Sequence, residues 1–235
     1  MDSSELNRWQ AVFAGWIDEA GAGDAAHDPA HVRRVVANAV RLGQTEAAAA
    51  EVVLPAAWLH DCVLVPKSSP ERKRASQLAA VEAVRKLRGA DYPAEFLPGI
   101  AHAIAAHSFS AGIAPETLEA KIVQDADRLD ALGAIGIARC LALGGAMNRP
   151  LYAETDPFCD NRPADDGRFS LDHFPAKLLR LESTMQTAAG RHEAHRRTEF
   201  IRGYLAELRL EIETGGINEP RSTRKFMKLI GTEGV

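Results

Sequence analysis

Histidine and aspartate residues gather at four places in the sequence, and side chains of these two types can bind a metal ion. The four groups are His27-Asp28 with His31, His60-Asp61, His102 with His107, and Asp125 with Asp127 and Asp130. Neutral imidazole and ionised carboxylate suit a divalent ion of the Mn, Fe, Co, Ni or Zn group. Such a mixed set of ligands can leave positions open for water and substrate. We therefore expect a metal site that serves chemistry.

Helix geometry separates stronger ligand candidates from weaker ones. At about 100° per residue, Asp127 and Asp130 share one helix face, whereas Asp125 points largely away. We expect Asp125 to be structural. His102 and His107 would lie roughly 140° apart on a helix, so at most one of them should face the site, and we favour His107.

The pair His60-Asp61 follows an apolar stretch, residues 56–59, that should be buried. Ionisable groups that reach a core need a partner, and a metal ion is one such partner. A capped helix end is the alternative. The dipeptide alone does not decide between the two.

The elements that must position these side chains are predicted to be helices. Aromatic residues make up only 6% of the chain, and apolar residues recur at helical spacing. Helices are expected to begin near residues 4, 29, 45, 70, 93, 115 and 175. The helix that begins near 45 should end at His60-Asp61, and the one near 115 should be long, ending at 144. A loop is expected over 148–172, and a break near Gly190.

Length and charge limit the possible partners. The 235 residues carry 28 Lys and Arg against 32 Asp and Glu, a net charge of -4. This balance argues against a partner that is a nucleic-acid polymer or an anionic membrane. A chain of this length also buries enough surface to fold without disulfides or a structural metal.

A cytoplasmic location is the expectation from the remaining composition. The three cysteines are far apart and form no C-x-x-C pair, which is typical of a reducing compartment. Residues 1–5 are polar and acidic, unlike a signal peptide, and the most apolar stretch, 131–147, is interrupted by Arg139. Oligomeric state is left open.

The order of these motifs resembles that of the HD-domain metal-dependent phosphohydrolases. The resemblance rests on His31 in H-x-x-R-V, His60-Asp61 after A-A-W-L, and Asp127 in Q-D-A-D-R-L-D-A. Longer blocks, such as A-K-I-V-Q-D-A-D-R-L-D-A-L-G-A-I-G-I-A-R, resemble a bacterial, YedJ-like branch over roughly residues 10 to 210. This resemblance implies an all-α HD-domain helical bundle. One domain would span 1–214, and a tail, 215–235, is left unassigned.

By this resemblance, the metal ligands are His31, His60, Asp61 and Asp127. They would hold one divalent ion, which could be Mn, Mg, Co, Ni, Fe or Zn. The ion would lower the pKa of a water molecule and polarise a phosphoryl oxygen. Asp61 or a nearby carboxylate would take the proton. Asp130 is the second catalytic candidate and would orient a water or a sugar hydroxyl, unless it simply pairs with an arginine.

Four side chains are candidates for binding the substrate. Lys67 follows the metal pair in a V-P-K loop, where it could neutralise a phosphate or be solvated. Arg128 lies beside the predicted ligands of its helix, and His107 is the favoured pocket histidine. Arg34 could reach a phosphate, or it could be a surface charge.

The leading hypothesis is a phosphohydrolase that acts on a small phosphorylated compound, a nucleotide triphosphate or monophosphate. One alternative is a phosphodiesterase that acts on a cyclic nucleotide or another diester. A second alternative is a non-catalytic nucleotide-binding regulator with the same fold. A di-iron helical bundle would require Glu-x-x-His pairs, and the sequence contains none.

Overall fold

The computed structural model describes residues 1–19, 29–63, 65, 69–108 and 111–214. Every regular element in these ranges is helical, which confirms the predicted all-α class. The α-helices are α1 (Ser3–Glu19), α2 (Pro29–Glu46), α3 (Ala50–Leu59), α4 (Ala75–Gly89), α5 (Leu97–His107), α6 (Leu118–Leu129), α7 (Gly133–Ala146), α8 (His173–Ala176) and α9 (Ala188–Thr214). Short 3-10 helices are η1 (Pro70–Arg74), η2 (Ala94–Phe96), η4 (Leu178–Arg180) and η5 (Glu182–Thr184).

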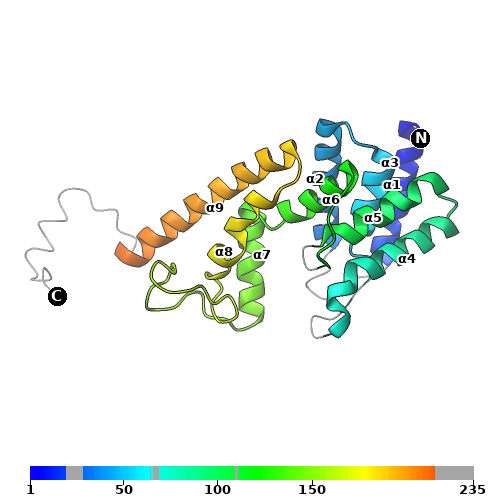
Figure 1. Cartoon of the computed structure of the whole chain (residues 1–235). Helices are drawn as coiled ribbons and strands as arrows, with labels where there is room; N and C mark the ends of the chain where they lie inside the picture. Colours follow the sequence, from blue (N-terminus) through cyan, green and yellow to red (C-terminus); the bar gives the residue numbers. More distant parts are fainter. Residues whose placement is uncertain (20–28, 64, 66–68, 109–110, 215–235) are drawn as a thin grey trace, which may run out of the picture.

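Helix α3 lies at the centre of the main helical bundle. Every residue from Val52 to Leu59 is buried, and the helix contacts α1, α2, α5 and α6 (Figure 1). Burial of this apolar helix on all sides removes a large nonpolar area from water. Its C-terminal end therefore delivers His60, which is itself fully buried, into the interior of the bundle.

The start of α3 differs from the expectation. Helix α2 continues through Gly43 to Glu46, and α3 begins only at Ala50. Gly43 is buried inside α2, where Val53 of α3 packs 3.7 Å from the position a Cβ atom would take. This glycine permits close helix packing and does not end its helix.

The long helix predicted from 115 to 144 is wrong, because the structure has two helices there. Helices α6 and α7 are bent by 60° relative to each other. Leu132 is extended, and Gly133 adopts a φ of 69°, a left-handed conformation that interrupts the helical hydrogen bonds. The bend turns α7 toward α9, against which it packs.

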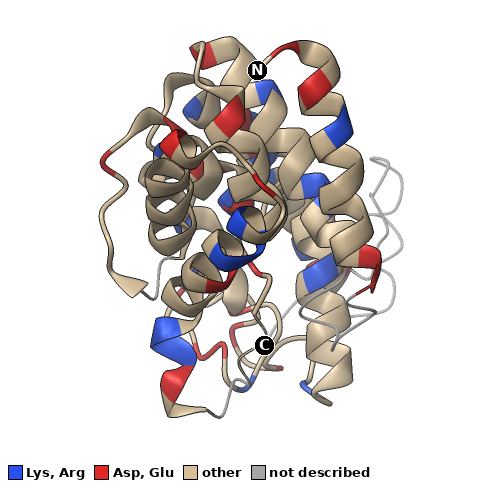
Figure 2. Ribbon diagram, turned by 90° about the vertical axis from the view of Figure 1, so that its right-hand side faces the viewer, with Lys and Arg blue, Asp and Glu red and all other residues tan. Residues whose placement is uncertain are grey.

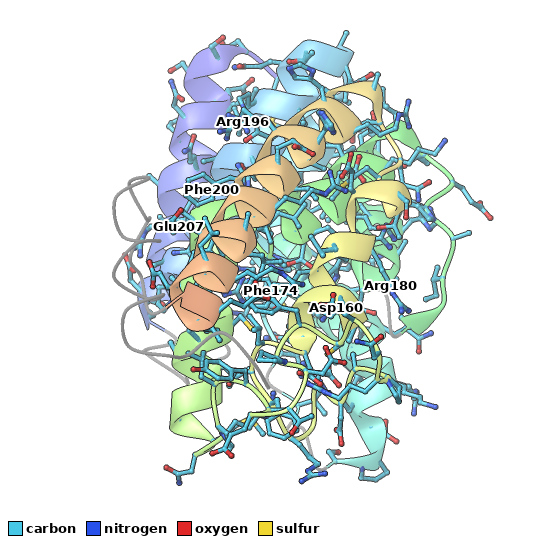
Figure 3. All side chains as sticks on the ribbon, turned by 90° about the vertical axis from the view of Figure 1, so that its left-hand side faces the viewer. Asp160, Phe174, Arg180, Arg196, Phe200 and Glu207 are labelled. Atoms are coloured by element: carbon cyan, nitrogen blue, oxygen red, sulfur yellow. The ribbon has the colours of Figure 1, made fainter. Side chains whose placement is uncertain are left out.

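Helices α7, α8 and α9 lie together at one side of the main bundle (Figure 1). Helix α9 begins at Ala188, after the non-helical residues 185–187, which agrees with the break predicted near Gly190. It contacts α2 and α6 as well as α7. Figure 3 shows Phe200 on the outer side of α9 and Phe174 of α8 beneath the helix. Phe174 is fully buried and stacks on Tyr204, with ring centroids 6.2 Å apart.

Asp125 fastens the start of α9 to α6. Its carboxylate accepts hydrogen bonds from the backbone N–H groups of Gln186 and Thr187, at 2.9 and 2.8 Å, and from the Thr187 hydroxyl at 2.8 Å. These groups precede the first turn of α9, whose N–H groups otherwise lack partners. Asp125 is thus structural, as expected.

The predicted loop over 148–172 contains no helix or strand. Its end is anchored by the fully buried Asp172, which accepts hydrogen bonds from the Arg162 guanidinium at 2.5 and 2.8 Å. The backbone N–H of Asp165 donates to the same carboxylate at 2.7 Å. Buried pairing of this kind holds the loop in a defined path.

Charged residues of both signs are interspersed along the helices in the view of Figure 2. In the described part of the chain, no single helix is long and apolar enough to cross a membrane. Helices α6 and α7 reach that length and apolar character only when they are taken together, and the two are bent relative to each other.

Candidate metal site

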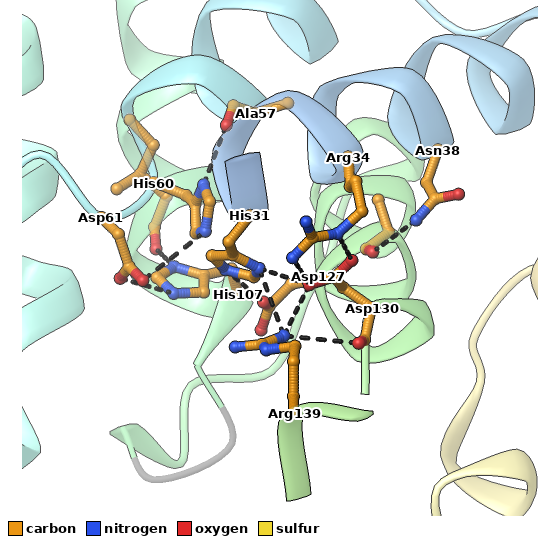
Figure 4. A network of polar contacts seen from close by, with 12 residues as sticks. His31, Arg34, Asn38, Ala57, His60, Asp61, His107, Asp127, Asp130 and Arg139 are labelled. Atoms are coloured by element: carbon orange, nitrogen blue, oxygen red, sulfur yellow. Dashed lines mark hydrogen bonds and ion pairs between the residues drawn. The ribbon is translucent and has the colours of Figure 1, made fainter. Parts of the chain in front are cut away.

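Five side chains from four helices converge at one point of the bundle (Figure 4). His31 lies in the first turn of α2, His60 and Asp61 follow α3, His107 ends α5, and Asp127 belongs to α6. We call these five residues the histidine–aspartate cluster. The structure thus brings the four predicted metal ligands together and adds His107, which was expected only as a pocket residue.

The ligand atoms of the cluster face one another. His31 Nε2 lies 3.4 Å from Asp127 Oδ1. The two oxygens of Asp61 each lie 3.6 Å from a histidine Nε2 atom, one from His60 and one from His107. The His60 ring stands edge-on to both other imidazoles, with ring centroids 5.5 and 5.0 Å away.

His60 and His107 are oriented by the helices that precede them. His60 Nδ1 lies 2.8 Å from the carbonyl oxygen of Ala57, and His107 Nδ1 lies 2.6 Å from that of Ile104. Each Nδ1 atom therefore carries the hydrogen and donates it, because a carbonyl oxygen can only accept. This bond leaves each Nε2 with a free lone pair directed into the cluster. Histidines that ligate metals are commonly held in this way.

The cluster fits a divalent metal ion by its own contacts. His60 Nε2 is buried and has no hydrogen-bond partner among the described residues. A buried acceptor without a partner is unfavourable, and a cation would satisfy it. Ligand atoms of His31, His60 and Asp127 lie within 4.8 Å of one another, as do those of His60, Asp61 and His107. His60 is common to both sets.

Comparison with known proteins agrees with this geometry. Residues 30–132 match the HD domain family. The chain is 33% identical over 192 residues to the uncharacterized protein YpgQ of Bacillus subtilis, covering 80% of this chain and 85% of that protein. The chain belongs to the HD-domain family. The HD-domain helical bundle expected from the sequence is therefore confirmed.

Solved structures of similar proteins share the HD fold. An HD-superfamily hydrolase from Bacillus thuringiensis is 31% identical, with a TM-score of 0.67 over 88% of this chain and 96% of that one. The structure of Bacillus subtilis YpgQ in complex with ADP is also 31% identical, with a TM-score of 0.68 over 91% of this chain and 99% of that one. These likenesses support a hydrolase of the HD superfamily.

The two carboxylates of the histidine–aspartate cluster are ionised at neutral pH. Burial alone would raise the pKa of Asp61, but the nearby imidazoles of His107 and His31, whose own pKa values are raised, hold this pKa well below its usual range. Burial opposes ionisation of Asp127 in the same way, and its contact with His31 overcomes that effect and lowers the pKa. The cluster thus offers two negative charges to a cation.

The histidines of the cluster differ in their protonation. Burial lowers the pKa of His60, which keeps that imidazole neutral, as a metal ligand must be. Burial also disfavours the charged form of His31, but hydrogen bonds with Asp127 and Asp130 outweigh it and raise the pKa to about 9. Without a metal, the imidazolium of His31 supplies a positive charge beside Asp127. A metal ion would replace that proton.

Asp130 supports His31 from behind. Its buried carboxylate lies 2.7 Å from His31 Nδ1 and also accepts from Arg34, at 2.6 and 3.1 Å, and from Arg139 Nη1 at 2.5 Å. Of the two roles considered for Asp130, the structure shows the ion pair with arginine. Both oxygens already accept hydrogen bonds and the side chain is only 1% exposed, so this placement favours support of His31 over a direct contact with a water or a sugar hydroxyl. Asp130 is instead a positioning residue for His31.

The other three predicted substrate-binding residues lie in different surroundings. Arg34 lies at the cluster but directs its guanidinium at Asp130. Arg128 does not face the cluster: one position from Asp127, it is turned about 100° around α6 and donates to the carbonyl of Thr184 at 2.6 Å. Its predicted contact with substrate does not fit this direction. Lys67 lies outside the described residues.

Arg139 lies at the cluster although it was not among the residues predicted for the site. The sequence shows it only as a charge within an apolar stretch, and a single straight helix would carry it away from Asp127. The bend before Gly133 returns it to the cluster, where it pairs with Asp130. His102, by contrast, lies apart and accepts a hydrogen bond from the backbone N–H of Glu116 at 3.0 Å.

Proposed function

We propose that this HD-family protein is a metal-dependent phosphohydrolase that hydrolyses a nucleotide, either a triphosphate or a monophosphate. One observation carries the proposal: three Nε2 atoms and two carboxylates converge, while the Nδ1 atom of each histidine is held by an oxygen acceptor. A purely structural cluster does not require the buried His60 Nε2 atom to remain without a donor.

The chain's own residues have distinct tasks in this proposal. One divalent ion is held by His31, His60, Asp61 and Asp127. Mn, Mg, Co, Ni, Fe and Zn are the candidates for this ion. His107 adds a further imidazole ligand beside them. Such an ion, when bound, acidifies a water molecule and polarises a phosphoryl oxygen. The side chain of Asp61 is 33% exposed, so water reaches it at the mouth of the cluster, where Asp61 or a nearby carboxylate would take the proton.

The nucleotide assignment is supported by similarity. Bacillus subtilis YpgQ, to which the chain is 33% identical, has been crystallised with ADP. The resemblance of several sequence blocks to the bacterial YedJ-like branch is in line with an enzyme of this kind. We further propose that the protein acts in the cytoplasm on a small molecule and that it uses neither a membrane nor a nucleic-acid polymer as a partner.

Phosphate release from nucleoside triphosphates, nucleoside monophosphates and cyclic nucleotides, each with Mn, Mg, Co or Ni, tests the proposal. We expect hydrolysis with at least one metal and its loss in His60→Ala. The matched control is His102→Ala, since His102 lies outside the cluster. Release from diesters alone would favour the phosphodiesterase alternative. Nucleotide binding without hydrolysis under any condition would favour a regulator and contradict the proposed activity.

A further inference from the structure

We propose that Arg139 binds a phosphate oxygen of the substrate while it holds Asp130. This inference rests on the proposed function and adds a substrate contact to the same site. Arg139 belongs to α7, beyond residues 30–132 that match the HD domain family. The contact would therefore come from a part of the chain that follows the matched domain.

The polar contacts of Arg139 all use one of its nitrogens. Nη1 donates to Asp130 Oδ2 at 2.5 Å and to the Asp130 carbonyl at 3.3 Å. The same atom lies 3.3 Å from His31 Nδ1, but this approach is no hydrogen bond. Arginine can only donate, and His31 Nδ1 carries the hydrogen that it gives to Asp130. Within the described part of the chain, Nε and Nη2 make no hydrogen bond.

The guanidinium of Arg139 is also accessible at the cluster. Its side chain is 41% exposed, although its partner Asp130 is only 1% exposed. Arg139 Nη1 lies 3.3 Å from His31 Nδ1, on one side of the imidazole ring, and His31 Nε2 faces Asp127 on the other side. In Figure 4, the two other guanidinium nitrogens of Arg139 point away from Asp130. They are thus available to a ligand at the cluster.

Charge favours an anionic ligand at this position. With a divalent ion to offset Asp61 and Asp127, the two positive charges of Arg34 and Arg139 exceed the single negative charge of Asp130 by one. A planar guanidinium can bond two acceptors at once, and its donor spacing matches phosphate oxygens. Arg139 can therefore keep Asp130 with Nη1 and bind phosphate with its remaining donors.

Arg34 provides a matched comparison. It pairs with the same carboxylate, but it does so through two nitrogens, Nε at 2.6 Å and Nη2 at 3.1 Å. Removal of either arginine deprives Asp130 of one cationic partner. Only removal of Arg139 also removes the proposed phosphate contact.

Calorimetric titration of the manganese-loaded protein tests this inference with two probes, inorganic phosphate and a non-hydrolysable nucleoside diphosphate analogue. We expect R139Q to weaken binding of the phosphate-bearing probes by about 10- to 100-fold, as for loss of a charge-assisted hydrogen bond. R34Q should weaken it by less than about threefold. R139K, which can still pair with Asp130, should fall between them and serves if R139Q does not fold by circular dichroism.

Manganese affinity, measured without phosphate, separates the two roles of Arg139. R139Q and R34Q should lower it by similar factors, because both weaken the support of Asp130. The inference is overturned if phosphate binds R139Q as tightly as the wild type, if R34Q weakens phosphate binding equally, or if the wild type binds neither probe. Phosphate binding that depends on Arg139, without any nucleotide binding or hydrolysis, would instead overturn the nucleotide assignment and leave this inference standing.

Discussion

His31 Nδ1 and Asp130 Oδ2 lie 2.7 Å apart in the interior, although 99 positions of sequence separate the two residues. The contact joins the first turn of α2 to the end of α6. It fixes the orientation of the His31 ring, so that Nε2 faces Asp127 at 3.4 Å. A carboxylate behind a metal-binding histidine also makes the imidazole a better donor to the metal.

The first prediction concerns Asp130→Asn. The change preserves shape but removes the charge that supports His31, so manganese affinity should fall by about 10- to 100-fold. Titration calorimetry measures this loss, and excess manganese should restore part of the activity. Asp125→Asn is the control on the same helix. Because Asp125 secures α9, its loss should lower the Tm but leave the metal affinity of the folded protein unchanged. Wild-type affinity in Asp130→Asn would refute a positioning role.

The second prediction is that metal stabilises the bundle. The proposed ligands come from α2, α3 and α6, so an ion bound only by the folded state ties these helices together. Manganese at a hundred times its Kd should raise the Tm by about 5–10 °C relative to protein in EDTA. Thermal unfolding measures the shift, which should vanish in Asp61→Ala. An equal shift in that variant would mean that the metal binds elsewhere.

The third prediction concerns pH in the absence of metal. His31 has a pKa of about 9 in the folded protein, raised from 6.5. A raised pKa contributes stability that is complete below pH 6.5 and is lost as the pH rises through 9. The loss should be up to about 3 kcal/mol. The raised pKa of His107 acts in the same direction. The pKa of His60 is lowered by burial, so this residue opposes the trend only near pH 6.5, where the unfolded histidine still binds a proton, and it contributes little at higher pH.

Binding of metal should show the opposite trend with pH. The ion competes with the proton on His31, so metal affinity should rise with pH up to about 9. The difference in Tm between manganese-loaded and EDTA-treated protein should therefore grow from pH 6.5 to 8.5. His31→Asn should flatten the pH dependence of the metal-free protein. If the metal-free Tm follows the same curve in wild type and variant, His31 does not carry the excess proton.

Local patterns in the sequence predict much of the cluster. The apolar residues 56–59 indicate that His60 enters the core, and rotation around a helix separates Asp127 from Asp125 and lets only one of His102 and His107 face the site. Each of these inferences depends on spacing within one helix. Such spacing is nearly independent of how the helices pack.

Features that depend on packing between helices escape sequence reasoning. Residues 130–132 separate α6 from α7, and Gly133, the first residue of α7, adopts a left-handed φ of 69° where Arg197 of α9 packs 3.3 Å from the position a Cβ atom would take. The role of Arg139 depends on that bend, so the sequence alone offers no sign of it. Arg128 is an intermediate case, because rotation around α6 already turns it away from Asp127, and only its acceptor, the carbonyl of Thr184, depends on packing between elements.

The last prediction tests the junction between α6 and α9. A Cβ atom at Gly190 would lie 2.8 Å from Thr187 Oγ1 and closer still to Asp125 Oδ2. Gly190→Ala must therefore displace the carboxylate that caps α9, and we expect a loss of about 1–3 kcal/mol in the free energy of unfolding.

Gly203→Ala is the matched control on the same helix. No heavy atom lies within 4 Å of a Cβ atom at Gly203, so alanine there should stabilise α9 by about 0.5–1 kcal/mol. Urea unfolding of both variants measures the two opposite changes. Manganese affinity should stay at the wild-type level in each, since neither glycine touches the cluster. Equal stabilisation by both alanines would show that Asp125 does not need the space left by Gly190.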